Sequence, residues 1–267
     1  MRNYLLCGLL LVSASSAEPR PLAPLKNWDL DYGETQCIAY RTYGEAAKPI
    51  TLAIRPSANG ATYEILVEVP GPAPDSAEEL QGSVDFGHGP IKAWLLHYRP
   101  TTTKLNLYQF RISAGDMDQA RSASTIRLHV QNLPDFEFEL ALMPQLLTGL
   151  DGCVADLKRY WNMDGEKDGR IAKQAKGDVR KVFASPDDYP AEALRRGQEG
   201  DAQYLLLVNE AGKVAGCQVL LPTGVPILDA MGCVVIQNRA KFTPALDANG
   251  KPVRSTVVTP KVTWRTS

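Results

Sequence analysis

The feature that most constrains the fold is the stretch from Tyr189 to Trp264, because its strands, turns and helix follow one another as in a single folding unit. The predicted elements are strands over 202–208 and 214–221, a turn over 209–213, an apolar helix from Pro226 to about Asn238, and a last strand over 254–264. Gly212 lies in the turn, where a hairpin needs a positive φ, and Pro244 follows the helix, which a proline cannot continue. We therefore predict a small α+β unit at the C-terminus.

Short motifs mark these elements in a fixed order: Tyr189-Pro190, Ala193-Leu194 before two glycines, Leu228-Asp229, Phe242-x-Pro244-Ala245 and Gly250-x-Pro252-Val253. Together they resemble the TonB C-terminal domain family, over about the last third of the chain. The resemblance implies an αββαβ domain in the periplasm, with an antiparallel sheet and two helices on one face. It also implies that the domain binds a short extended peptide, which energy transducers of the family take from outer-membrane transporters.

The chain departs from those energy transducers in its other parts. They have an N-terminal membrane anchor and a long linker rich in Pro and Lys, whereas this chain has dispersed prolines and a β-rich region in the linker's place. Their Gln-Pro-x-Tyr-Pro signature becomes Ser-Pro-Asp-Asp-Tyr-Pro over 185–190. These departures count against energy transduction but leave peptide binding intact, because binding needs only an edge strand.

The N-terminus is typical of a secretory signal peptide over residues 1–17. Arg2 precedes an apolar run over 4–12, and the small residues 15–17 suit a cleavage site. The run is roughly half of the 20 or so residues that cross a bilayer. We expect a periplasmic protein that starts at Glu18. The alternative is an energy transducer with a short uncleaved anchor in the inner membrane, facing the periplasm and coupled to outer-membrane transporters, and membrane contact is expected only then.

Residues 28–161 are predicted to form a β-rich, sandwich-like domain with a terminal helix. Strand-like runs, separated by turns rich in Pro, Gly, Asn and Asp, lie at 51–55, 63–69, 93–98, 105–112, 125–130 and 136–142. Such a series favours an antiparallel sandwich or barrel. After Pro144, apolar residues recur at helical steps as far as Trp161. An extended arm over 18–27 precedes this domain, and a polar linker over 162–180 leads to the C-terminal domain at 181–267.

Cys7 lies in the signal peptide, so four cysteines remain, and these allow three pairings. An exported protein uses such cysteines in disulfides. We favour Cys37–Cys153 and Cys217–Cys233, because each pair then lies within one domain. A zinc site is disfavoured, since no two cysteines have a zinc-knuckle spacing and the three histidines cluster with none of them. We predict no metal and no cofactor.

Catalytic motifs are not found in the sequence. It has no Gly-x-Ser-x-Gly elbow, no His-Glu-x-x-His and no phosphate-binding loop. His88 has no base or nucleophile nearby and is interpreted as a turn residue, and Asp187-Asp188 as a solvated approach to the C-terminal domain. The run 164–175 is spaced like a calcium loop, but Ala175 stands where a glutamate is needed, which favours a solvated linker. We predict no catalytic residue, although an envelope hydrolase or sensor acting through the β-rich domain stays an alternative.

The last strand carries the predicted binding site. It is β-branched and, by the family resemblance, lies at a sheet edge, where unpaired backbone groups can accept an added strand. The formal net charge of −1 argues against nucleic acid. We predict a periplasmic TonB-like protein whose partner is a peptide or protein, with an outer-membrane transporter as the candidate that the resemblance implies. The predicted partner-binding residues are Tyr189, Pro190, Thr256, Val257, Val258 and Thr259. Pro260 and Lys261 follow them and could instead serve to keep this edge unpaired.

Overall fold

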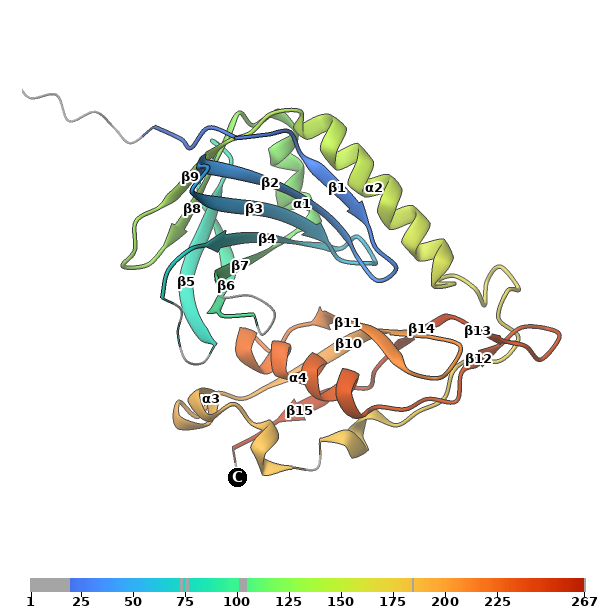
Figure 1. Ribbon diagram of the computed structural model, residues 1–267. Helices are drawn as coiled ribbons and strands as arrows, with labels where there is room; N and C mark the ends of the chain where they lie inside the picture. The colour runs from blue at the N-terminus through green and yellow to red at the C-terminus, as the bar shows by residue number, and fades with distance from the viewer. Residues whose placement is uncertain (1–19, 73, 75–76, 101–104, 184, 267) are drawn as a thin grey trace, which may run out of the picture.

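The computed structural model describes residues 20–72, 74, 77–100, 105–183 and 185–266 (Figure 1). The signal peptide predicted for residues 1–17, and the first two residues of the predicted arm, lie outside these ranges. The described chain combines a large curled antiparallel sheet with a smaller α+β region that follows it, which is the predicted fold class (Figure 1).

The large sheet is one continuous sheet of nine strands, and its order is β1-β2-β3-β4-β7-β6-β5-β8-β9. The strands are β1 (Asp29–Tyr32), β2 (Cys37–Glu45), β3 (Lys48–Pro56), β4 (Thr62–Val69), β5 (Glu78–Asp85), β6 (Ile91–Tyr98), β7 (Asn106–Ser113), β8 (Thr125–Val130) and β9 (Phe136–Glu139). Alternate residues of β2, including Cys37, Ala39 and Tyr43, are buried inside the curl. The sequence was compatible with a sandwich or a barrel. The structure excludes a sandwich of two sheets, because these nine strands pair in one series.

The extended arm closes this sheet. Leu22 N donates to Glu137 O (2.7 Å), and Glu139 N donates to Leu22 O (3.0 Å), which pairs the arm with β9. On its other side, Leu25 N donates to Thr42 O of β2 (2.8 Å). The arm thus takes the place of a strand between the two ends of the series, and we call residues 20–161 the β-barrel.

Helices cover one side of the β-barrel. The short helices α1 (Ala114–Met117) and η1 (Asp118–Ser122) follow β7, and α2 (Met143–Tyr160) packs against β1, β2 and η1. The buried residues of α2 recur at helical spacing: Met143, Leu146, Leu147, Leu150, Cys153, Val154 and Leu157. A disulfide joins Cys153 to Cys37, with an S–S distance of 2.00 Å, in the pairing predicted from the sequence. It ties α2 to the start of β2.

The segment predicted as a polar linker is tied to the structure along part of its length. Lys173 N donates to Leu246 O (3.0 Å), and Lys176 N donates to Thr243 O (2.9 Å). Gly177 lies against the ring of Phe242, where an added Cβ would come within 2.5 Å of a ring carbon. A side chain at 177 would therefore displace Phe242, which is 7% exposed and belongs to the C-terminal core.

The C-terminal region has the predicted αββαβ order. Its elements are η2 (Val179–Val182), η3 (Pro186–Asp188), α3 (Ala191–Arg195), β10 (Gly200–Val208), β11 (Val214–Leu221), α4 (Pro226–Arg239), β12 (Ala245–Leu246), β13 (Pro252–Val253), β14 (Ser255–Val258) and β15 (Val262–Trp264). The sheet order is β11-β10-β14, and β15 also pairs with β10. Gly212 has φ +74° in the turn between β10 and β11, as the sequence predicts.

The two regions contact one another through both apolar and polar groups. Leu96 of β6 packs with Ile227, Leu228 and Trp264 in a shared cluster. Glu79 of β5 accepts a hydrogen bond from Ile227 N at the start of α4 (2.9 Å), which satisfies a backbone donor that the helix itself leaves unpaired. The barrel therefore fixes the position of α4. In the described part of the chain, every helix is too short or too polar to cross a bilayer.

Candidate partner-binding site

β14 lies at one edge of the C-terminal sheet. It pairs antiparallel with β10, with Val208 opposite Ser255 and Leu205 opposite Val258. Within the described residues no strand pairs with its other side. Val258 is 56% exposed, and Thr256 and Val257 are half-buried. These three predicted residues lie on an open edge.

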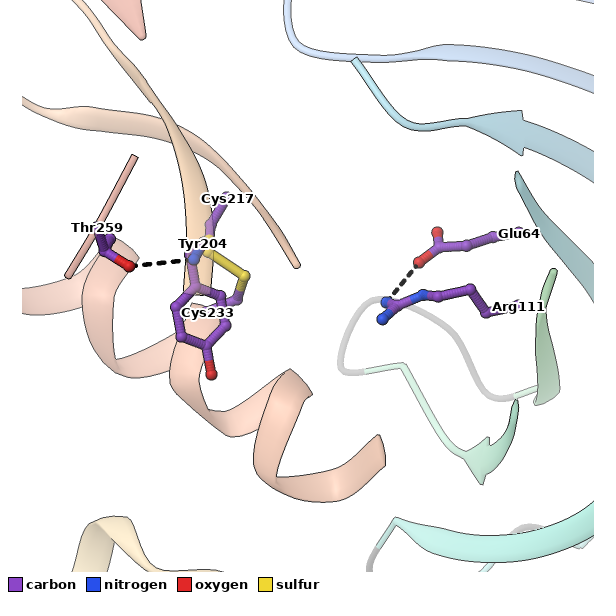
Figure 2. The surroundings of a disulfide bond; sticks show 6 residues. All are labelled: Glu64, Arg111, Tyr204, Cys217, Cys233 and Thr259. Atoms are coloured by element: carbon purple, nitrogen blue, oxygen red, sulfur yellow. Dashed lines mark hydrogen bonds and ion pairs between the residues drawn. A yellow bond between two sulfur atoms is a disulfide. The ribbon is translucent and has the colours of Figure 1, made fainter. Parts of the chain in front are cut away.

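Thr259 occupies a different position from its three predecessors. It is 2% exposed, and its hydroxyl accepts a hydrogen bond from Tyr204 N (3.0 Å), while Thr259 N donates to Tyr204 O (2.9 Å) (Figure 2). The predicted single last strand is therefore two strands, β14 and β15, with a break around Pro260. The proline has no N–H to give to the ladder. At the break, the Thr259 hydroxyl accepts the hydrogen bond from the β10 backbone N–H that a continuous strand would otherwise accept.

Tyr189 and Pro190 lie near β15, at the opposite end of β10 from Ser255. The Tyr189 hydroxyl donates to Gln198 O, and its ring meets that of Trp264 edge-on, with 5.4 Å between the centroids. Pro190 is buried directly before α3. Tyr189 thus packs against the cluster that the C-terminal region shares with Leu96 of β6.

The predicted solvated approach at Asp187-Asp188 is wrong for Asp188. Asp188 is 6% exposed, and its Oδ2 accepts from Arg239 Nη1 (2.7 Å) and from Ser185 N (3.3 Å). The hydrogen bond with Arg239 holds the Asp188 pKa below its ordinary value. Local sequence patterns do not reveal this pairing, because Arg239 is 51 residues away at the end of α4.

The second disulfide joins β11 to α4. Cys217 and Cys233 have an S–S distance of 2.04 Å, in the pairing predicted from the sequence (Figure 2). Tyr204 lies under the same helix. Gly232 leaves room for the Tyr204 ring, because a Cβ added to residue 232 would lie 1.9 Å from the phenol oxygen. The helix can approach the sheet this closely only with glycine at 232.

Residues 185–266 match the Gram-negative bacterial TonB protein C-terminal family. No curated protein matches the chain. The match indicates a TonB-like envelope protein involved in transport, and the family's domain is not an enzyme. We call residues 185–266 the TonB-like domain. TonB domains of this family interact with outer-membrane proteins, and the proteins that carry them are periplasmic or anchored in the inner membrane.

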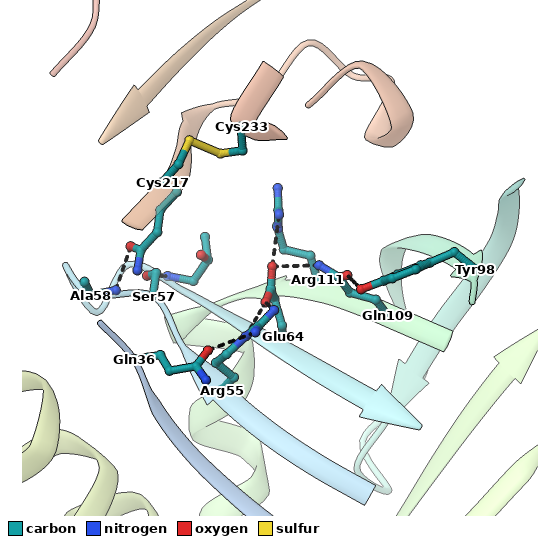
Figure 3. A network of polar contacts seen from close by, with 12 residues as sticks. Gln36, Arg55, Ser57, Ala58, Glu64, Tyr98, Gln109, Arg111, Cys217 and Cys233 are labelled. Carbon is teal, nitrogen blue, oxygen red and sulfur yellow. Dashed lines mark hydrogen bonds and ion pairs between the residues drawn. A yellow bond between two sulfur atoms is a disulfide. The ribbon is translucent and has the colours of Figure 1, made fainter. Parts of the chain in front are cut away.

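A polar network that the sequence did not predict lies on the outer face of the barrel (Figure 3). Glu64 of β4 is directly opposite Arg55 of β3 on one side and Arg111 of β7 on the other. It accepts hydrogen bonds from Arg55 Nε (2.8 Å), Arg111 Nη2 (3.0 Å) and Gln109 Nε2 (2.8 Å). Burial by itself would raise the Glu64 pKa, but the two guanidinium groups outweigh it and hold the pKa below its ordinary value.

A cleft of about 330 Å³ lies between this network and the TonB-like domain. Its lining comes from strands of the barrel, from β11 and from α4, and includes Arg55, Glu64, Arg111, Cys217 and Asp229. In Figure 3, Arg111 extends from the barrel toward the Cys217–Cys233 disulfide. The lining residues include no histidine, and both cysteines are in the disulfide. The polar lining side chains offer hydrogen bonds and ion pairs to a ligand.

The other sequence candidates are separated from one another. His88 is exposed in a turn, His97 stacks on Tyr108 at 4.2 Å, and the Nδ1 atom of His129 lies 2.7 Å from a carboxylate oxygen of Asp135. No cluster of three potential ligands occurs where the structure describes the chain. In the calcium-like run, Arg170 pairs with Asp168 (2.6 Å).

Proposed function

We propose that this protein is a periplasmic TonB-like protein that binds a partner strand along β14, in the context of transport across the outer membrane. The observation that carries the proposal is the open edge of β14 in a domain of this family. The partner would be a peptide or a protein segment, such as an extended segment of an outer-membrane transporter. A cleavable signal peptide over residues 1–17 would deliver the protein to the periplasm.

Strand addition draws its affinity from main-chain hydrogen bonds and its specificity from alternate side chains. The backbone of Thr256–Val258 supplies the free edge, and the exposed side chain of Val258 supplies an apolar contact. Thr259 is already bonded to Tyr204, so the added strand would end before it. The predicted binding segment is thereby shortened to three residues.

A second candidate function is a sensor role of the β-barrel. It is favoured by the cleft, which brings polar groups of three barrel strands against the TonB-like domain. A ligand in the cleft would contact both regions at once. This role adds to partner binding at β14 and does not replace it.

Photocrosslinking in intact cells tests the proposal. A benzophenone amino acid is placed at Val258, which is 56% exposed, and in a control protein at Tyr32 of the barrel, which is 55% exposed. Position 258 is expected to capture an envelope protein that position 32 does not capture, and mass spectrometry identifies it. The same captured set from both positions would reject β14 as the binding edge. N-terminal sequencing of the exported protein separates a mature start at Glu18 from an uncleaved anchor.

A further inference from the structure

The cleft between the barrel and the TonB-like domain is bordered by a second open sheet edge. Five consecutive residues of β11, at positions 215–219, line it. β11 is the outermost strand of its sheet, and among the described residues only β10 forms a ladder with it. In an antiparallel pair, every second residue directs its N–H and C=O away from the partner strand. The β11 backbone therefore presents hydrogen-bonding groups to the cleft.

The barrel side of the cleft carries positive charge. On this side, Arg55 and Arg111 flank the carboxylate of Glu64, so these three side chains carry one net positive charge, and the other carboxylate that lines the cleft, Asp229, is on the helix side. Arg55 is fully engaged, since it binds Glu64 through two nitrogens and Gln36 through the third. Arg111 binds Glu64 through Nη2 alone, and its side chain is 23% exposed. Among the described residues, Glu64 is the side-chain partner of Arg111, so the other donors of Arg111 are available to a ligand in the cleft.

The helix side of the cleft offers a buried acceptor. Asp229 of α4 is 1% exposed and lines the cleft. Its Oδ1 accepts from Thr223 N (2.9 Å), and its Oδ2 has no hydrogen-bond partner among the described residues. A buried acceptor without a donor destabilises the folded protein. A ligand that donates an N–H to this oxygen would remove that penalty, which favours its binding.

We propose that the cleft binds an extended peptide that carries an acidic side chain, as a strand added to β11. The peptide main chain pairs with β11, its carboxylate pairs with Arg111, and one of its amide N–H groups donates to Asp229 Oδ2. At a rise of about 3.3 Å per residue, the five lining residues of β11 match a peptide of about five residues. An inorganic anion would satisfy Arg111 but would leave Asp229 and the β11 edge without donors. This site is separate from the edge of β14.

The test uses the full-length mature protein and two acetylated, amidated pentapeptides. Both have valine and threonine around the central residue, which is aspartate in one peptide and asparagine in the other. Binding is followed by NMR, through the amide shifts of residues 215–219. The aspartate peptide is expected to shift these amides and to bind at least fivefold more tightly than the asparagine peptide. Absence of shifts at β11, or equal affinity for both peptides, would overturn the proposal.

Two matched variants on α4 locate the site. Ala230 is exposed and lines the cleft, so Ala230→Trp should fill the cleft without disturbing the fold and should weaken the aspartate peptide at least tenfold. Val234 is 49% exposed on the same helix and does not line the cleft, so Val234→Trp should leave affinity unchanged. Equal affinity of the two tryptophan variants would place the peptide elsewhere.

Two further variants test the contact with Arg111 and exclude binding of the peptide at β14. Arg111→Gln should abolish the preference for aspartate over asparagine, and a preserved preference would contradict the role of Arg111. Val258→Pro, which alters β14, should leave this peptide's affinity unchanged. If Val258→Pro weakens the peptide as much as Ala230→Trp does, the peptide binds at β14 and the cleft site is wrong. Self-association that Ala230→Trp abolishes would identify a second copy as the occupant and would also reject the peptide.

Discussion

The β-barrel and the TonB-like domain are built alike in one respect and differ in another. Each has an antiparallel sheet that a disulfide ties to a helix, through Cys37–Cys153 in the barrel and Cys217–Cys233 in the TonB-like domain. The barrel uses its arm to pair both ends of its sheet, whereas the TonB-like domain leaves β11 and β14 unpaired on their outer sides within the described chain. Open edges invite association with other chains. This contrast supports our proposal that a partner binds the TonB-like domain.

The largest expected effect compares the two disulfides. The bridged cysteines are 116 residues apart in the barrel and 16 apart in the TonB-like domain. In the chain-entropy model, loops of these lengths correspond to about 5 and about 3 kcal/mol of stability. Replacing Cys37 and Cys153 by alanine should therefore lower the free energy of unfolding more than replacing Cys217 and Cys233. Urea denaturation followed by tryptophan fluorescence measures both.

Thiol counting provides the control for these variants. The denatured, unreduced mature protein should have no free thiol, and each double variant should have none either. Four free thiols in the parent protein would contradict both bridges. Equal losses of stability in the two variants would contradict the loop-length argument and would remove this difference between the two regions.

The next effect concerns two carboxylates whose pKa values shift in opposite directions. Burial raises the pKa of Asp229 from 3.8 to about 6, despite the hydrogen bond from Thr223 N. The folded state then binds more protons than the unfolded state between about pH 4 and 6, so stability falls as the pH rises through this range. Two pKa units correspond to about 3 kcal/mol. Asp229→Asn should remove this loss and so stabilise the protein at pH 7 while changing it little at pH 4.

Glu64 supplies the opposite case. Its folded pKa lies below the ordinary value because of Arg55 and Arg111, so its contribution is present above pH 4.5 and is lost as the pH falls through the folded pKa. Glu64→Gln should therefore destabilise the protein at pH 7 more than at low pH. Denaturation midpoints measured from pH 3 to 7.5 check both variants. Parallel curves for parent and Asp229→Asn would show that this carboxyl does not titrate with a raised pKa.

A smaller effect tests the closure of the barrel. Leu22→Pro removes the N–H that donates to Glu137 O, which should cost about 1–2 kcal/mol and leave the edge of β9 less well paired. The control is Ala23→Pro, since Ala23 is exposed and its N–H makes no backbone hydrogen bond within the described chain. Light scattering should show self-association of Leu22→Pro only. If both variants stay monomeric and equally stable, arm pairing does not protect the barrel edge.

The smallest expected effect on stability belongs to Val258→Pro. Position 258 is exposed at an open edge, so the substitution should change the denaturation midpoint little, while it removes one donor from the strand that would receive the partner. Crosslinking from Thr256 in the Val258→Pro protein should then lose the captured partner. Unchanged capture with an intact circular dichroism spectrum would show that the partner does not add a strand at β14.

Much of the fold could be predicted from local patterns. The helical spacing of apolar residues from Leu146 to Leu157 predicted α2, and Gly212 predicted the turn between β10 and β11. The cysteine pairing followed from assigning each pair to one region. These predictions succeeded because spacing along the chain reports directly which face of an element is buried.

The candidate sites were only partly predictable. The sequence placed Thr256–Val258 in an edge strand through the family resemblance, but it gave Thr259 the same role, because β-branched residues on an edge and in a sheet interior look alike in sequence. It gave no sign that Arg55, Glu64 and Arg111 would be neighbours. They are neighbours because β3, β4 and β7 pair in one register, and β7 reaches β4 only after two intervening strands.

The sequence by itself determined six of the nine strands of the large sheet, helix α2, the order of the main C-terminal elements, the two disulfide pairs and the family of the C-terminal third. The tertiary structure alone decided which edges are closed and which stay open, where the last strand breaks, and that the barrel and β11 enclose a cleft. The physical reason is the range of the interactions. Periodicity and turn chemistry act between residues a few positions apart, whereas the arm meets Glu137 and Glu139 across more than a hundred residues, through backbone groups that every residue type carries.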